Sequence, residues 1–350
     1  GQLAALTNGG DGDPMRPGGV AAMNWNGRVL PVRVAGKCGA DVADIVDGMR
    51  WAAGLPVAGV PPNPNPARII NISFGGSAAC GNLYQQAIDE LRALPNGGAV
   101  VVAAAGNGWS STISRPASCN GVVGVGALNR DGFKSNYSNF GPKVVVSTVG
   151  GDDNDGTWGP YLADSGIVTI GNASATSPGL PTYYGEFGTS FSTPIVAGAV
   201  SLMLSVNPAL TVEQVIQGLR ASARPHVTSS VPGVGSCSDA NPGRCLCTSA
   251  TCGAGILDVK RALDFAAAPT SYAPPMLSAP DVDSPELRSA VALGQDRPAN
   301  PLPPPQASGG GGGGASSAPW IVALLLATCA LGAAQRLSSR KARTRCRRAG

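Results

Sequence analysis

The sequence is organised around one stretch, Gly185-Glu186-Phe187-Gly188-Thr189-Ser190-Phe191-Ser192-Thr193-Pro194-Ile195-Val196-Ala197-Gly198. A Gly-Thr-Ser turn leads into a run, residues 195–204, that holds only Ala, Gly, Ser, Val, Leu, Ile and Met. Because a helix that is apolar on every side belongs in a protein core, we expect a buried helix here. Ser190 would sit at its N-terminus, where unpaired backbone N–H groups and the positive helix dipole meet negative charge. Pro194 falls in or near the first turn, where a missing N–H costs little. A serine so placed can attack a carbonyl carbon while nearby amides hold the oxyanion.

This stretch resembles the nucleophile motif of the subtilisin-like serine proteases, Gly-Thr-Ser-x-(Ser/Ala)-x-Pro-x-(Val/Ile)-(Ala/Ser)-Gly. The resemblance implies that Ser190 is the nucleophile and forms an acyl-enzyme. The alternative is a helix start whose small residues only allow tight packing. It looks closest to the extracellular branch from Gram-negative bacteria, because of a Gly-Lys-Cys-Gly loop and the segment Pro116-Ala117-Ser118-Cys119.

A second segment, Val101-Val102-Ala103-Ala104-Ala105-Gly106-Asn107, resembles the strand and turn that end in the family's oxyanion-hole asparagine. The resemblance implies that the Asn107 side-chain amide donates to the developing oxyanion. In subtilisin itself, loss of this donor costs about a hundred- to a thousandfold in rate. Taken alone, Asn107 would be a turn asparagine that tolerates left-handed geometry. Its place after this strand favours the catalytic role.

A third segment, Asn71-Ile72-Ser73-Phe74-Gly75-Gly76, resembles the family's substrate-binding edge, where a peptide adds as an extra strand. Two walls of the first specificity pocket are implied, one formed by Ser73, Phe74 and Gly75 and the other by Ala104, Ala105 and Gly106. Their small side chains suggest room for a large apolar substrate residue. The alternative is a strand that simply ends in a Gly-Gly turn.

The sequence departs from the family pattern in its catalytic triad, whose order should be Asp, His, Ser. Neither the His-Gly-Thr-His-Val-Ala-Gly motif nor an upstream aspartate motif is present, and His226 follows Ser190 in a proline-flanked loop. Residues 1–5 look like those that follow the histidine helix, so we interpret the sequence as N-terminally truncated. We expect these residues alone to be nearly inactive, since subtilisin without its histidine loses about two million-fold in turnover. The alternative function is a pseudoprotease, tethered at the cell surface, that binds extended peptides without cutting them.

Hydrophobic patterning predicts strands that alternate with helices, and hence a mainly parallel sheet between helices, the three-layer α/β fold of the subtilisins. The expected strands are Arg28–Val34, Arg68–Ile72, Ala99–Ala104, Val122–Leu128 and Val144–Val149. The expected helices are Asp41–Gly54, Leu83–Leu94 and one opened by the capping-box spacing of Thr211 and Gln214. The segment Leu257–Ala267 closes the domain.

Composition divides the chain into a peptidase domain (1–267), a Pro/Ser/Gly-rich linker (268–317), an apolar helix (318–334) and a basic tail (335–350). The apolar segment is 17 residues long, at the short end for a membrane span. The order of a glycine run, an apolar helix and a cluster of arginines resembles a GlyGly-type C-terminal sorting signal of secreted Gram-negative proteins. This resemblance implies that a rhomboid-like protease removes the tail. The alternative is a permanent anchor. Either way we expect the protein outside the inner membrane, secreted or on the cell surface and at least transiently anchored.

Charge is concentrated in the tail. The net charge is +4, but the last fifteen residues carry seven basic side chains and no acidic ones. Without those seven, 18 basic residues face 21 acidic ones and the net charge becomes −3. We therefore expect polypeptide substrates and no nucleic-acid partner. No cofactor or metal is expected to be required. Asp152–Gly156 offers oxygen ligands for calcium, but without EF-hand spacing a solvated acidic loop is the favoured interpretation.

Four of the nine cysteines cluster at Cys237, Cys245, Cys247 and Cys252. Their spacings of eight, two and five do not match paired Cys-x-x-Cys zinc sites, so disulfides in an oxidising compartment are favoured. Our preferred pairing is Cys237–Cys245 and Cys247–Cys252. Cys38 and Cys80 should lie in loops beside the cleft, where a disulfide between them is compatible with the sequence. Cys119 is then left to pair with a cysteine outside these residues.

Overall fold

A computed structural model describes the chain at Leu3 and at residues 22–36, 39–153, 155–164, 166–172, 174, 177 and 179–293. Its centre is a sheet of four parallel strands in the order β1-β2-β3-β4. These strands are β1 (Ile69–Ile72), β2 (Val100–Ala104), β3 (Val122–Leu128) and β4 (Val144–Val149). Each lies within one residue of a strand expected from the sequence.

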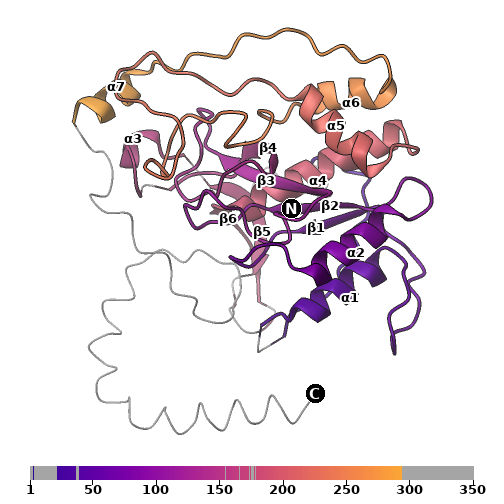
Figure 1. The fold of residues 1–350 in the computed structure, drawn as a ribbon. Helices are drawn as coiled ribbons and strands as arrows, with labels where there is room; N and C mark the ends of the chain where they lie inside the picture. The colour runs from indigo at the N-terminus through magenta and orange to yellow at the C-terminus, as the bar shows by residue number, and fades with distance from the viewer. Residues whose placement is uncertain are drawn as a thin grey trace, which may run out of the picture.

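Helices cover both faces of the sheet (Figure 1). One face packs against α1 (Val42–Ala52) and α2 (Asn82–Arg92), and the other against α4 (Thr189–Val206), α5 (Val212–Ser222) and α6 (Val259–Ala267). Strand β2 shows why its sequence is continuously apolar. Val101 and Ala103 join the core beside α1 and α2, whereas Val100 and Val102 join the core beside α4. The structure therefore confirms the expected three-layer α/β fold.

Helix α4 is the apolar helix expected from the opening motif. Its buried residues lie on every side, because it packs against all four strands and against α6. Pro194 lies one turn further in than expected, as the sixth residue of the helix, so it offers no N–H to the carbonyl of Ser190. The Thr193 hydroxyl donates to the Thr189 carbonyl at 2.7 Å in the same turn. The capping box of Thr211 and Gln214 that opens α5 is also confirmed.

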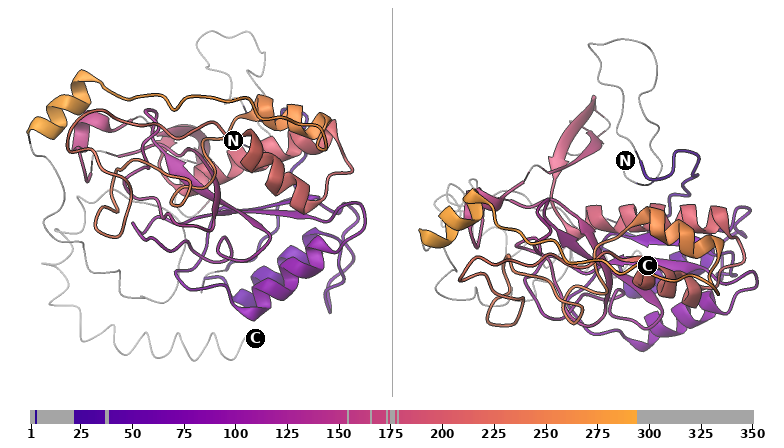
Figure 2. Two further views of the ribbon diagram at one scale, coloured as in Figure 1. Left: turned by 45° about the horizontal axis from the view of Figure 1, so that its top comes forward. Right: turned by 90° about the horizontal axis from the view of Figure 1, so that it is seen from above.

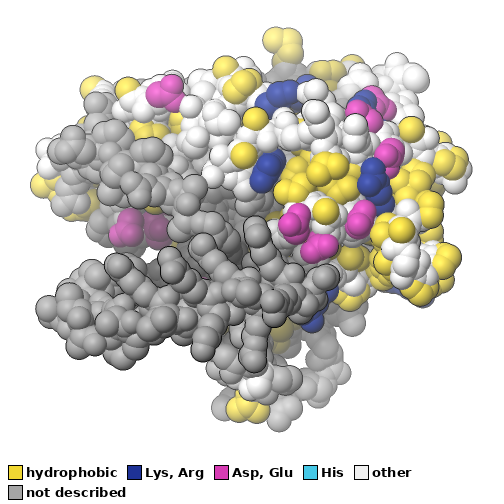
Figure 3. All heavy atoms as spheres, turned by 60° about the horizontal axis from the view of Figure 1, so that its bottom comes forward, with side chains coloured by type: hydrophobic (Ala, Val, Ile, Leu, Met, Phe, Trp, Pro, Cys, Tyr) yellow, Lys and Arg dark blue, Asp and Glu magenta, His cyan; other side chains and the backbone are white. Residues whose placement is uncertain are grey.

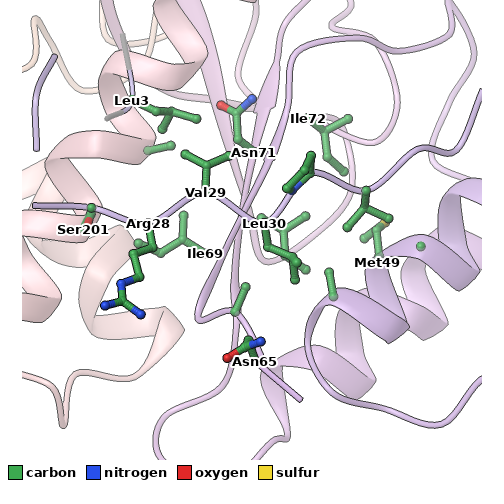
Figure 4. A pocket seen from close by; sticks show the side chains of 18 of the residues that line it. Leu3, Arg28, Val29, Leu30, Met49, Asn65, Ile69, Asn71, Ile72 and Ser201 are labelled. Carbon is green, nitrogen blue, oxygen red and sulfur yellow. The ribbon is translucent and has the colours of Figure 1, made fainter. Parts of the chain in front are cut away.

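The strand expected at Arg28–Val34 does not form. The alternation is present, since Leu30, Val32 and Val34 are half-buried while the residues between them are exposed. However, a cavity of about 800 Å³ lies between this segment and β1, which ends the described sheet (Figure 4). Ile69 and Ile72 of β1, with Met49 of α1, line that cavity. The segment has the side-chain pattern of a strand, but within the part of the chain that the structure describes it pairs with no other strand.

Three features were not predicted. An antiparallel hairpin of β5 (Ile167–Asn172) and β6 (Pro181–Glu186) projects from the body and leads into α4 (Figure 2). The short helix α3 (Gly159–Leu162) packs beside α7 (Pro285–Ala292). In α7, Leu287 and Ala290 are fully buried against a cluster that includes Phe133 and Trp158. Residues 268–293 thus fold back onto the domain, and an extended linker from 268 does not describe them.

The predicted apolar helix at 318–334 and the basic tail at 335–350 lie outside the described residues. Among the residues that the structure describes, α4 is long and apolar enough to cross a membrane, but most of it is buried in the core. On the face shown in Figure 3, basic and acidic side chains lie close together among apolar ones. One ion pair of the described residues joins Arg50 of α1 to Glu90 of α2 at 2.7 Å.

Candidate active site

Ser190 is the second residue of α4, immediately after the turn made by Gly188 and Thr189. Gly188 has φ +146°, which favours glycine at this position. Ser190 is half-buried, and its Oγ donates a hydrogen bond to the backbone carbonyl of Ser73 at 2.8 Å. Among the described residues, the partner of this hydroxyl is therefore a backbone oxygen and not a basic side chain. The candidate nucleophile and the candidate substrate edge lie together, as expected.

Asn107 lies on the exposed turn that follows β2 and contacts the start of α4. Its Oδ1 accepts hydrogen bonds from the backbone N–H of Thr189 at 3.0 Å and from the Thr189 hydroxyl at 2.8 Å. Because a backbone N–H can only donate, the accepting atom must be the amide oxygen, which turns Nδ2 to the other side. That nitrogen lies over Gly188, where an added Cβ would approach it to 3.2 Å. The turn thus presents an N–H donor beside Gly188, two residues before Ser190.

The two predicted pocket walls follow neighbouring strands. Ser73, Phe74 and Gly75 continue β1, while Ala104 ends β2 and leads into Ala105 and Gly106. Since both strands are parallel, the walls lie at the same edge of the sheet.

A strap at Ser114 and Arg115 joins the two walls. The N–H of Ser114 donates to the carbonyl of Ala105 at 2.8 Å, and Arg115 exchanges two backbone hydrogen bonds with Gly76, each 3.0 Å. A Cβ added at Gly75 would lie 2.4 Å from the Arg115 carbonyl oxygen. Glycine at this position therefore allows the strap to approach. The strap carries no periodic signal, so the sequence pattern did not reveal it.

The loop between β3 and β4 also supports the Asn107 turn, and its role was not predicted. Asn139 donates from Nδ2 to the carbonyl of Ala105 at 3.0 Å. Its Oδ1 accepts from the N–H groups of Gly108 at 2.8 Å and Ser110 at 3.0 Å. Asn139 is buried, so these bonds are shielded from water. A polar residue in a loop gives no sequence signal for such contacts.

His226 is placed as expected for a residue that is not the base. It is buried, and its Nε2 lies 3.1 Å from the carbonyl oxygen of Gly253. Burial lowers the pKa of this imidazole, which keeps the ring neutral.

The acidic segment at 152–156 differs from the solvated loop that was expected. Asp152 is fully buried and pairs with Arg244, whose Nε lies 2.5 Å from Asp152 Oδ2. The Arg244 guanidinium also donates to the backbone carbonyls of Asp153, Thr157 and Gly159. Burial raises the pKa of the Asp152 carboxyl to about 6. A guanidinium thus occupies oxygen atoms that a calcium ion would need, and of the three aspartates in this segment Asp155 is the exposed one.

Among the described residues, disulfides join Cys80 to Cys119, Cys237 to Cys245 and Cys247 to Cys252. The two pairs predicted in the C-terminal cluster are confirmed. Pairing of Cys80 with Cys38 is wrong, as is an outside partner for Cys119, because the strap brings Cys119 against the loop that carries Cys80. Cys38 itself lies outside the described residues. The Sγ atoms of Cys237, Cys247 and Cys252 lie within 4.8 Å of one another, but each belongs to a disulfide and is not a thiolate ligand.

Comparison with known proteins agrees with this architecture. Residues 1–245 match the model of the subtilase family, peptidase S8. An extracellular protease of Xanthomonas campestris pv. campestris is 38% identical over 267 residues, which cover 76% of this chain and 39% of that protein. An extracellular basic protease of Dichelobacter nodosus is 36% identical over 206 residues, which cover 59% of this chain and 30% of that protein.

A solved protease structure from Pseudoalteromonas arctica superposes with a TM-score of 0.62 at 36% identity. The match covers 76% of this chain and 69% of the solved chain. The chain therefore spans well under half the length of the two curated relatives, and most of the solved structure. Matched over most of its length by the family model, this chain belongs to the subtilase family.

Proposed function

We propose that the chain forms the nucleophile and oxyanion-hole part of a serine endopeptidase. Ser190 Oγ attacks the scissile carbonyl carbon while a base removes the hydroxyl proton. The base gives this proton to the leaving amine as the C–N bond breaks, and the acyl-enzyme that remains is then hydrolysed by water. The oxyanion would be held by the Asn107 Nδ2 and by the N–H of Ser190, which lies in the first turn of α4 where helical N–H groups have no intrahelical partner. The observation that carries this proposal is the pair of hydrogen bonds from Thr189 to Asn107 Oδ1, because they turn the amide nitrogen away from Thr189.

The proposed substrate is a polypeptide in extended conformation. It would lie along Ser73, Phe74 and Gly75 on one side and Ala104, Ala105 and Gly106 on the other, and bind through backbone hydrogen bonds. Phe74 is 38% exposed and adds apolar surface at this edge. No cofactor enters the proposed reaction, since acyl transfer needs only the nucleophile, the base and the oxyanion donors.

The base must come from polypeptide other than these residues, because His226 is the single histidine and it faces Gly253. The open edge of β1 gives such a segment a place to bind. The Arg68 carbonyl accepts a hydrogen bond from Val100 of β2. Because the backbone groups of successive strand residues point to opposite sides, those of Ile69, Asn71 and Ser73 point away from β2 and toward the cavity. The Ser73 carbonyl is also the partner of Ser190 Oγ. A strand added along this edge would therefore end beside the nucleophile.

We also propose that the protein acts outside the cytoplasm. The two curated relatives are named extracellular proteases, and the three disulfides of the described residues suit an oxidising compartment. The sorting signal or anchor at 318–334, with its rhomboid-like processing protease, remains our proposal for how the protein is held at the membrane.

The test joins this chain to a subtilase segment that carries the Asp and His motifs and measures hydrolysis of a chromogenic peptide. We expect turnover from the joined protein and none above background from Ser190→Ala. Ser205→Ala is the matched control, because Ser205 is an exposed serine of the same helix whose hydroxyl donates to the Ser201 carbonyl. Equal turnover in the Ser190→Ala and Ser205→Ala proteins would refute the proposed nucleophile.

Peptide binding without cleavage is the second candidate, favoured by the contact of Ser190 Oγ with a carbonyl oxygen rather than with a base. If this candidate is right, the 350-residue chain should bind an extended apolar peptide. Gly75→Val should weaken that binding, because a side chain at this position would collide with the Arg115 carbonyl and distort the substrate edge. The joined protein should then show binding but no hydrolysis. Hydrolysis by the joined protein would exclude this candidate.

A further inference from the structure

The loop that connects β3 to β4 touches both halves of the candidate oxyanion hole. Tyr137 in this loop is 7% exposed, and its hydroxyl oxygen accepts a hydrogen bond from the N–H of Gly188 at 2.8 Å. The hydroxyl proton has two acceptors, the carbonyls of Gly150 and Gly151, each at 2.8 Å. The phenol therefore bridges the end of β4 and the glycine that precedes the nucleophile helix.

The backbone of the same residue supports the opposite side of the site. The Tyr137 carbonyl accepts from the N–H of Trp109 at 3.1 Å, two residues beyond Asn107. Asn139 lies two residues after Tyr137, and its N–H donates to the carbonyl of Gly106 at 2.8 Å. One short segment thus holds the turn that carries Asn107 through its backbone and holds Gly188 through a side chain.

We propose that Tyr137 is a positioning residue, which fixes Gly188 and thereby sets the place of Ser190 relative to the amide of Asn107. The inference rests on the proposed function of Ser190 and Asn107 and goes beyond it, since Tyr137 touches neither the substrate nor the reacting atoms. Burial raises the pKa of its phenol well above the ordinary value, so the hydroxyl stays protonated at working pH.

Replacement of the phenol should loosen the site without unfolding the protein. The Gly188 N–H lies 3.0 Å from the Gly150 carbonyl as well, so Tyr137→Phe does not leave it without an acceptor. What the variant loses is the bridge from the β3–β4 loop to the start of α4. A displacement of well under 1 Å at a reacting group changes rate more than affinity, because it alters alignment in the transition state.

The first experiment needs no catalytic activity. Hydrogen–deuterium exchange of the 350-residue chain should show faster exchange in Tyr137→Phe for peptides that span Gly188 and Ser190. Peptides from α2, on the other face of the sheet, should be unchanged. Tyr272→Phe is the matched control, because its buried hydroxyl has no hydrogen-bond partner among the described residues. Exchange at Gly188 that is identical in wild type and Tyr137→Phe would overturn the bridge.

The second experiment uses the chain joined to the Asp- and His-bearing segment. Tyr137→Phe should lower kcat about tenfold and leave KM little changed, as expected of misalignment. A rise in KM at constant kcat would contradict a positioning role. If Tyr137→Phe does not fold, 3-fluorotyrosine is placed at this position instead. It keeps the hydroxyl bridge but makes the phenol oxygen a weaker hydrogen-bond acceptor for the Gly188 N–H. An unaltered kcat in this protein would count against the inference. If wild type itself hydrolyses nothing, the proposed function fails, while the exchange experiment still decides the bridge.

Discussion

Thr189 donates twice to the same atom of Asn107, from its backbone N–H at 3.0 Å and from its hydroxyl at 2.8 Å. Thr189 is the neighbour of Ser190 in α4, so the candidate nucleophile and the candidate oxyanion donor are joined through one residue. The same hydroxyl oxygen accepts from the N–H of Gly106 at 3.2 Å. The Thr189 hydroxyl therefore connects the turn after β2 to the start of α4.

This contact predicts a graded effect of substitution at Thr189. Thr189→Val keeps the shape of the side chain but removes the hydroxyl, so the Asn107 amide loses one of its two supports. We expect kcat of the joined protein to fall about tenfold with KM little changed, because alignment is lost. Thr189→Ser should restore most of kcat. Equal kcat values for the Val and Ser variants would show that the hydroxyl does not position Asn107.

Asn107→Leu removes the donor itself while approximately keeping side-chain volume. Turnover should fall about a hundredfold or more, with a smaller change in KM, since the donor serves the oxyanion of the transition state. Steady-state kinetics of the joined protein measures both constants. An unaltered turnover number would exclude Asn107 from the oxyanion hole.

The sequence sufficed to predict the sheet, because parallel strands covered on both faces give continuous apolar runs such as 99–104. The opening motif likewise placed Ser190 at the start of a buried helix, and both features are local in the chain. The position of Asn107 near Ser190 is not local, since Asn107 and Thr189 are 82 residues apart, and it was implied by the family resemblance. The strand expected at Arg28–Val34 failed for a non-local reason, because side-chain alternation cannot tell whether a neighbouring strand is at hand to pair with.

The supports of the site were not predictable in the same way. Tyr137, Asn139 and Ser114 lie in irregular loops, where no periodicity marks which polar atom will meet which backbone group. The same limit explains the error at Cys119, whose partner depends on how the strap at Ser114 and Arg115 packs. Burial of Asp152 was missed because its partner, Arg244, lies 92 residues away in the sequence.

The disulfide between Cys80 and Cys119 should contribute more to stability than the one between Cys247 and Cys252. Their sequence separations are 39 and 5 residues. Loop-closure entropy then predicts losses of about 4 and about 2 kcal/mol when each pair is replaced by alanine. Urea unfolding of the two double variants measures this difference. Non-reducing peptide maps should contain the three linked pairs, and a map that links Cys80 to Cys38 would contradict the assignment.

Arg244→Met should strongly destabilise the protein, because it leaves the buried carboxylate of Asp152 without its counter-charge. The expected loss in unfolding free energy is about 3–5 kcal/mol. Asp152 and Arg244 are both fully buried, so salt should not mask the effect. A loss as small as that of Arg130→Met, which removes an exposed cation with only a 4.0 Å contact to Asp131, would contradict the buried pair.

Asp152 also predicts a pH dependence of stability. Its folded pKa of about 6 lies above the ordinary value of 3.8, because burial disfavours the charged form. The folded state therefore binds this proton more tightly than the unfolded state, and the resulting stabilisation is lost as pH rises through the folded pKa. The unfolding free energy of wild type, relative to Asp152→Asn, should fall between about pH 4 and about pH 6. A relative free energy that rises over this interval would contradict the direction of the shift.

Covalent labelling of Ser190 tests the central claim most directly. The chain joined to the Asp- and His-bearing segment is treated with a fluorophosphonate, and the modified residue is mapped by peptide mass spectrometry. We predict one adduct on Ser190, none in Ser190→Ala, and slower labelling in Thr189→Val. An adduct that persists in Ser190→Ala, or a folded joined protein whose Ser190 stays unlabelled, would contradict the account.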